Sequence, residues 1–157
     1  MAVKRFRGKT KLMYFRKTDT TTQFKDGSFV RLDADGTIGQ LLGDSDDHIL
    51  GVCRMAIAAI DTAFVGAPRV PVEVPVEDYV EWDVDMDSDG TAADSDAGSY
   101  VGIDTTTDSG LSDRIDISDT AIRHFLVVGV SDTVVDKIRV VIARKASSVP
   151  GDTAIAA

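Results

Sequence analysis

The chain of 157 residues carries 17 Lys or Arg against 26 Asp or Glu, a net charge of −9, and 43% of its residues are hydrophobic. This size and composition predict one soluble globular domain that buries a core without disulfides, and the single cysteine, Cys53, excludes an internal disulfide. The apolar runs are too short to cross a membrane as a helix. Because no apolar segment follows the basic start, we expect no secretory signal.

Charge is distributed unevenly along the chain. Residues 1–31 carry nine basic against two acidic residues, a balance of +7, whereas residues 32–157 carry eight basic against 24 acidic residues, a balance of −16. We interpret residues 1–22 as an extended basic N-terminal arm. Aromatic and apolar side chains between the cations favour docking of this arm on another surface over plain solvation. A nucleic acid is the weakest of the partners considered, since the acidic body would repel phosphate.

Residues 23–146 form the body, in which short apolar segments alternate with turn residues, and residues 147–157 are expected to be a flexible tail. Asp26-Gly27 and Asp35-Gly36 are typical of tight turns. With no regular βαβ alternation, the pattern predicts a mainly β fold, an antiparallel β-barrel or sandwich resembling a jelly roll. The expected strands lie at 28–32, 49–54, 70–86, 98–104, 114–118, 125–131 and 137–145.

Residues 70–86 alternate throughout. Four valines at even positions begin the stretch, and Pro71 and Pro75 fall between them. Because proline cannot donate to a strand ladder, this half predicts an edge strand or a long arm. The second half keeps Trp82 and its apolar neighbours on the same parity and places acidic residues on the other. It predicts a half-buried strand with an acidic outer face.

The stretch DMDSDGTAADSD, residues 85–96, fits the calcium-loop frame D-x-D-x-D-G-x5-E except at the last position, where Asp96 replaces Glu. Strand patterns on both sides exclude an EF-hand, which requires flanking helices. Two interpretations stay open, a calcium loop between strands or an acidic hairpin, and strand parity favours the hairpin. The calcium ligands would be Asp85, Asp87, Asp89 and Asp96.

Nothing in the sequence announces catalysis. His48 and His124 share no ligand spacing, and motifs for nucleophile elbows, phosphate loops and zinc sites are missing. Cys53 sits in an apolar stretch and is expected to be a buried structural residue. The segment 117–125 has room for one short helix capped by Ser118 or Asp119. We therefore expect no enzyme, no catalytic residue and no required cofactor.

Four segments together resemble the head decoration, or cement, proteins of tailed bacteriophages: ILGVCRMAIAAIDTAF, VPVEVPVEDYVEWDVD, GTAADSDAGSYVGID, and FLVVGV followed by IRVVIARK. The resemblance covers roughly residues 24–145. It implies a non-enzymatic virion structural protein that is made in the host cytoplasm and binds the outer surface of the capsid as a homotrimer. Its partner would be the major capsid protein, with no direct contact to nucleic acid or membrane. There it would stabilise the shell against internal DNA pressure.

Two groups of residues become site candidates under this resemblance. Val72, Val74, Val76 and Trp82 are candidates for the trimer interface, with the core of the single chain as the alternative for Trp82. Two other function classes stay open: a calcium-binding β-type adhesion module and a phage tail structural component. The candidates for capsid binding in the arm are Arg5, Phe6, Arg7, Lys9, Lys11, Tyr14, Phe15 and Arg16.

Overall fold

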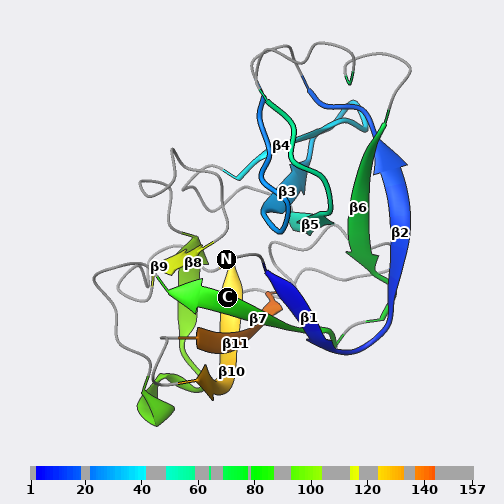
Figure 1. The fold of residues 1–157 in the computed structure, drawn as a ribbon. Coiled ribbons are helices and arrows are strands. Elements are labelled where there is room, and N and C mark those ends of the chain that lie inside the picture. Colours follow the sequence, from blue (N-terminus) through cyan, green and yellow to red (C-terminus); the bar gives the residue numbers. More distant parts are fainter. Residues whose placement is uncertain are drawn as a thin grey trace.

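The computed structural model describes residues 3–18, 22–41, 49–58, 64, 69–77, 79–86, 93–103, 114–116, 124–132 and 137–143. The regular structure of these residues is almost entirely β-strand, which confirms the predicted mainly β class, and the strands form a closed barrel and a second sheet (Figure 1). The described residues also include a short 3-10 turn, η2 (Asp94–Asp96). The short helix expected at 117–125 falls mostly outside the described residues.

The barrel is closed because the last strand in its order pairs with the first. Its order is β7-β11-β10-β8-β9, and β9 returns to pair with β7 in parallel, with Asp85 opposite Arg114 and Met86 opposite Ile115. β1 adds to the same strand, β7, outside this ring. The bounds are β1 (Lys4–Arg7), β7 (Glu81–Met86), β8 (Tyr100–Ile103), β9 (Arg114–Asp116), β10 (Phe125–Asp132) and β11 (Lys137–Ile142).

The second sheet has the order β2-β6-β5-β3-β4. Its last strand returns toward its first, because the Ile38 N–H donates to the Arg16 carbonyl (2.9 Å) and the Thr18 N–H donates to the Ile38 carbonyl (2.9 Å). β3 and β4 are joined by the predicted Asp35-Gly36 turn. The bounds are β2 (Thr10–Phe15), β3 (Phe29–Leu32), β4 (Ile38–Gln40), β5 (Ile49–Cys53) and β6 (Val70–Pro75).

One long ribbon joins the two assemblies. β1 and β2 follow each other along the chain, as do β6 and β7, and β1 pairs antiparallel with β7 while β2 pairs antiparallel with β6 (Figure 1). The ribbon bends at Gly8, whose φ is 100°. A Cβ at this position would lie 2.7 Å from the Tyr79 carbonyl oxygen, so only glycine fits the bend. Residues 4–15, assigned from the sequence to an arm outside the body, are thus strands of both assemblies.

Two apolar clusters fill the structure. The larger one fills the barrel and includes Trp82, Phe125 and, from the second sheet, Phe29. The smaller one lies on the other face of the second sheet and includes Val72 and Cys53. All five residues of β5 are buried, because this central strand contributes side chains to both clusters. Such burial on both faces explains why β5 is apolar throughout instead of alternating.

The prediction that residues 70–76 form an edge strand was wrong, because β6 lies between β2 and β5. The Val76 N–H donates to the Lys9 carbonyl (3.1 Å), so the backbone groups of even-numbered residues point at β2. Those of the odd-numbered residues, including Pro71 and Pro75, point toward β5. There the ladder pairs Val72 and Glu73 with β5, and the Pro71 carbonyl accepts the Arg54 N–H (2.9 Å) one residue further on. Pro71 therefore takes part as an acceptor alone, and Pro75 lies beyond the paired residues, so neither missing N–H breaks a bond of this ladder.

Candidate functional site

The N-terminal edge, which we define as residues 4–15, is mostly exposed to solvent. All four residues of β1 are exposed, and β2 is exposed or half-buried throughout. Residues 1–18 contain seven Lys or Arg and no Asp or Glu. Exposed apolar side chains accompany these cations, since Leu12 is 47% and Tyr14 58% exposed. This is the arrangement of cations and aromatics that the sequence predicted, displayed on paired strands.

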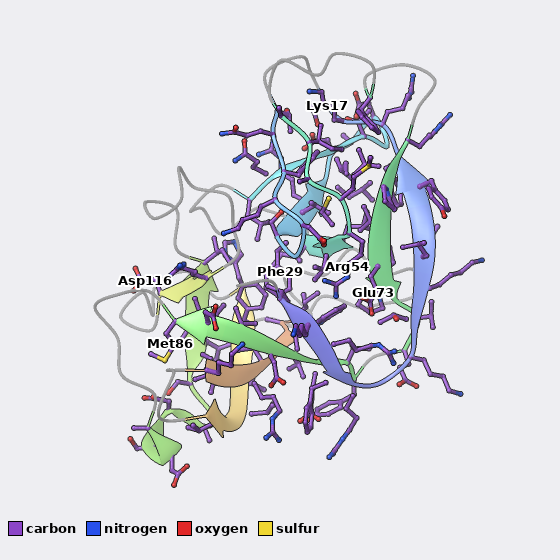
Figure 2. All side chains as sticks on the ribbon, in the orientation of Figure 1. Lys17, Phe29, Arg54, Glu73, Met86 and Asp116 are labelled. Atoms are coloured by element: carbon purple, nitrogen blue, oxygen red, sulfur yellow. The ribbon has the colours of Figure 1, made fainter. Side chains whose placement is uncertain are left out.

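Glu73 holds the N-terminal edge to the second sheet (Figure 2). Its Oε1 accepts hydrogen bonds from Nε (2.9 Å) and the Nη2 (2.7 Å) of Arg54, while its Oε2 lies 3.1 Å from Nε of Arg5 and accepts from the Thr10 hydroxyl (2.8 Å). Arg54 also donates to the carbonyl of Val3 (2.7 Å). Both carboxylate oxygens therefore have charged partners, which fixes the start of the chain against β6.

A second set of contacts holds β1 to the barrel. Arg7 Nε lies 3.2 Å from Oε2 of Glu81, and the Phe6 ring stacks under the Arg139 guanidinium, 3.9 Å from the ring centroid. The Tyr79 hydroxyl donates to Glu81 Oε1 (3.3 Å). Partial burial and the neighbouring Glu81 carboxylate raise the pKa of Tyr79. Arg5, Phe6 and Arg7, predicted as partner-binding residues, thus also fasten the edge to its own body.

The other predicted arm residues divide into two kinds. The side chains of Lys9, Lys11 and Tyr14 point outward and are exposed, although the Lys9 backbone N–H donates to Glu77 (2.6 Å). Arg16 is also exposed, and its carbonyl accepts the Ile38 N–H. Phe15 instead packs against the smaller apolar cluster. The residues most available to a partner are therefore Lys9, Lys11, Tyr14 and Arg16.

Three of the four trimer-interface candidates lie in the core of the single chain. Val72 and Val74 are 0% and 2% exposed within the smaller cluster, and Trp82 is 0% exposed inside the barrel. A buried side chain cannot contact a second copy, so the interface assignment of these three residues is corrected, and for Trp82 the alternative of the monomer core applies. Val76, 51% exposed at the bend of the ribbon, is the one candidate with accessible surface.

The acidic face of β7 is neutralised by its neighbours. Asp85 Oδ1 lies 3.2 Å from the Lys137 ammonium, and Asp83 Oδ1 lies 3.7 Å from Arg139 Nε. The predicted solvent-facing acidic surface is thus a ladder of ion pairs between β1, β7 and β11. Its carboxylates on β7 are largely shielded from solvent, whereas Arg7 on β1 is 67% exposed. This arrangement explains why acidic residues alternate with apolar ones along this strand.

Of the four proposed calcium ligands, Asp87 and Asp89 fall outside the described residues. Asp85 has the Lys137 partner described above, and Asp96 Oδ2 accepts the Ala93 N–H (2.9 Å) at the start of η2. The described part of the chain contains no group of three or more metal-binding side chains. Calcium binding by this loop stays a prediction.

Cys53 and His124 are both buried at 0% exposure. Burial raises the pKa of the Cys53 thiol to about 11, and its Sγ donates to the carbonyl of Met55 (2.9 Å). A thiol with this pKa stays protonated at neutral pH and is a poor nucleophile. His48 lies outside the described residues.

Sequence reasoning missed the carboxylates and the arginine that hold the N-terminal edge. Glu73 stands on the parity of the two prolines, which pointed to a solvent-facing side chain, and Arg54 follows an apolar strand with no motif around it. Their partners are 19 residues apart or more along the chain. No local pattern signals these contacts of Glu73, because they form only when β2, β6 and β5 lie side by side in the sheet.

The described elements thus define a small all-β protein with a closed five-stranded barrel, a second sheet and a cationic open edge. Comparison with protein-family models, with curated proteins and with solved structures found no match. Within the described residues, no helix has the length and apolarity needed to cross a membrane.

Proposed function

We propose that this chain is a non-enzymatic decoration protein of a tailed-phage head, which binds the outer surface of the capsid and stabilises the shell. The observation that carries the proposal is the N-terminal edge. Lys9, Lys11 and Tyr14 project outward from a paired strand, and within the described residues no carboxylate forms an ion pair with either lysine. An ordered set of cations and an aromatic anchor suits recognition of an acidic protein surface.

The fixed geometry of the edge supports the same proposal. A disordered tail loses conformational entropy when it binds, whereas a strand already held by Glu73 and Glu81 has lost most of that entropy on folding. The major capsid protein is the proposed partner, and the outer capsid surface is the proposed location. A repeated shell also presents many identical sites, so multivalent binding strengthens a modest individual contact.

A homotrimer is part of the proposal, and its interface has to use exposed residues. Val76 (51% exposed) and Tyr79 (50% exposed) lie close together in sequence at the bend of the ribbon. We assign the trimer contact to this bend. Light scattering on the purified chain tests it: we expect three times the monomer mass, and Val76→Asp should return the protein to the monomer. A wild-type monomer both in solution and on heads would contradict the trimer.

The binding proposal is tested by cosedimentation with mature heads of the phage that encodes the chain, and with its unassembled capsid subunits. We expect binding to heads alone, and a rise in the temperature at which decorated heads release their DNA. The double variant Lys9→Glu/Lys11→Glu should lose at least tenfold in affinity. Arg69→Glu, an exposed charge reversal outside the edge, is the matched control and should bind like wild type.

Deleting residues 2–17 is a poor test, because the deletion removes β1 and β2 and the buried Val3 along with the binding surface. Point substitutions at exposed positions avoid this problem. If the Lys9→Glu/Lys11→Glu variant bound heads as tightly as wild type, the N-terminal edge would not be the capsid-binding surface.

A further inference from the structure

One side of β2 is an open backbone edge. The Val76 N–H donates to the Lys9 carbonyl, and the register places Lys11, Met13 and Phe15 in the same hydrogen-bonding series toward β6. The residues between them, Thr10, Leu12 and Tyr14, therefore point their N–H and C=O groups away from β6. In the sheet formed by the described residues, no strand pairs with that side.

Arg16 is the next residue after Thr10, Leu12 and Tyr14 whose backbone groups point away from β6, and it shows how this side of the chain pairs with a neighbouring strand. The carbonyl of Arg16 accepts a hydrogen bond from the N–H of Ile38, in β4 (2.9 Å). The outward side of the chain is thus already used for β pairing at its far end. Thr10, Leu12 and Tyr14 continue that side with three further donors and three further acceptors in strand geometry.

The side chains beside this edge specify the chemistry of a strand that would add to it. On one face lie Leu12 (47% exposed) and Tyr14 (58% exposed), and on the other lie the exposed ammonium groups of Lys9 and Lys11. A complementary strand has apolar side chains on the first face and acidic side chains on the second. In sequence, such a strand alternates apolar and acidic residues.

The molecule already contains this pairing. β1, the neighbour of β2 in the same segment, is basic and pairs with β7, in which Trp82 and Val84 alternate with Glu81, Asp83 and Asp85. An ion pair between Arg7 and Glu81 (3.2 Å) accompanies the ladder. Charge and backbone together select an alternating acidic strand for β1, and the same features recur at the open edge of β2.

We propose that the open edge of β2 binds an extended segment of another protein, with alternating apolar and acidic residues, as an additional strand of the second sheet. Identifying that protein as the capsid protein rests on the proposed function; the strand-binding property does not. A second copy of β2 is a poorer occupant, because it would bring the cations of both copies, Lys9, Lys11 and Arg16, onto one ribbon.

Leu12→Pro is the variant that isolates the backbone edge. It removes an N–H that points away from β6, so the β2–β6 ladder is kept, as prolines on solvent-facing edge positions allow. Leu12→Ala, the matched control, shortens the same side chain and keeps the N–H. Met13→Pro removes an N–H that points at β6, and its melting temperature shows what loss of the β2 ladder looks like.

The probe is a synthetic fluorescent peptide with the sequence of residues 79–86, YVEWDVDM, measured by anisotropy against the purified full chain. We expect saturable binding that weakens at least tenfold in Leu12→Pro, changes less than threefold in Leu12→Ala, and disappears for a peptide with Lys in place of its acidic residues. If Leu12→Pro melts like Met13→Pro, the Lys9→Glu/Lys11→Glu variant replaces it, with the same loss expected.

Head binding separates the two proposals. Heads that bind wild type and Leu12→Pro equally would show that the open edge does not add a strand of the capsid protein, and would leave the decoration function standing. Peptide binding that depends on the Leu12 N–H, with no binding to heads, would overturn the decoration function and support the open edge as a strand-binding site. Peptide binding that is absent, or equal in Leu12→Pro, overturns the inference, as does self-association that Leu12→Pro abolishes.

Discussion

Two glutamates do more than any other described residues to place the N-terminal edge. Glu73 contacts Arg5, Thr10 and Arg54, and Glu81 contacts Arg7 and Tyr79. The Glu73 side chain is 16% exposed, so its ion pairs are only partly screened by water. Removing such a carboxylate leaves its partners with unbalanced charge in a partly dry environment.

The first prediction is that Glu73→Gln lowers the free energy of unfolding by about 2–4 kcal/mol, because two arginines lose their charged acceptor. Denaturant unfolding measures this loss. Glu77→Gln is the control: Glu77 is exposed and accepts one backbone N–H, from Lys9, so its loss should stay within about 1 kcal/mol. Equal losses for both variants would contradict the central role of Glu73.

Cys53 supplies the second prediction. Its pKa is about 11 in the folded chain against 9.0 for an ordinary thiol, because burial disfavours the thiolate. Between these pH values the unfolded chain releases a proton that the folded chain keeps, so stability falls as pH rises through this window, by roughly 2–3 kcal/mol in all. We expect Cys53→Ala to remove this dependence of the unfolding free energy on pH. The substitution also lowers the unfolding free energy at every pH, because buried packing is lost.

Thiol reactivity checks the same property independently. In the native protein at pH 8, Cys53 should react with a thiol reagent at least a hundredfold more slowly than in the chain unfolded by denaturant, since it is both buried and protonated. Reaction at similar rates in the two states would show that the thiol is accessible without unfolding.

Among the elements, the ribbon formed by β1–β2 and β6–β7 organises the molecule. It contributes one strand pair to the second sheet and another to the barrel, and it changes direction at Gly8. The positive φ of this residue favours glycine, and the close approach of Tyr79 and Val80 leaves no room for a side chain.

The third prediction compares two glycines with similar backbone conformations. Gly8→Ala should lower the free energy of unfolding by about 3 kcal/mol or more, because a Cβ meets the Tyr79 carbonyl at 2.7 Å and the backbone strain adds to this clash. Gly36→Ala, at φ 81° with nothing within 4 Å, carries the strain alone and should cost about 1 kcal/mol. Thermal or denaturant unfolding distinguishes them, and equal costs would mean that the bend adjusts to a side chain.

At the scale of the whole molecule, Phe29 joins the second sheet to the barrel. It comes from β3 (Figure 2), yet its ring contacts Phe125 (centroids 4.6 Å apart) and Trp82 (6.2 Å, edge to face) in the barrel cluster. β5 adds Ile49 and Val52 to the same cluster. Because one apolar core includes both assemblies, we expect them to unfold together.

The fourth prediction follows from this shared core. Phe29→Ala should lower the free energy of unfolding by about 3–5 kcal/mol, through lost burial and the cavity left between the assemblies. Phe6→Ala is the matched control, because this ring is 44% exposed and stacks on Arg139, so its loss should be about 1 kcal/mol. Calorimetry should show a single transition in wild type. Two separate transitions would contradict the shared core.

The sequence predicted most strands and turns correctly and misplaced some of their partners. The alternation of apolar and acidic residues identified β7 with its buried Trp82, and the Asp-Gly dipeptide identified the turn at Asp35-Gly36. Both signals act over a few residues. β6 was misassigned to an edge because its two prolines cannot donate backbone hydrogen bonds. Their missing N–H groups lie only on the side of β6 that faces β5, and the sequence did not show that β5 would pair there at Val72 and Glu73. The arm was separated from the body for a related reason, because its pairing partners lie 55 or more residues away.

For the candidate site, the sequence by itself determined the composition of the surface: a segment without acidic residues, with aromatic side chains between its cations, followed by an acidic body. Local charge and periodicity depend only on the order of residues, so the sequence is enough to predict them. Only the tertiary structure decided that this segment is two paired strands and that Glu73 and Glu81 hold it. It also decided that the backbone N–H and C=O groups of Thr10, Leu12 and Tyr14 point away from β6. Those properties depend on strand register between segments far apart in the chain, and register is fixed by packing of the whole molecule.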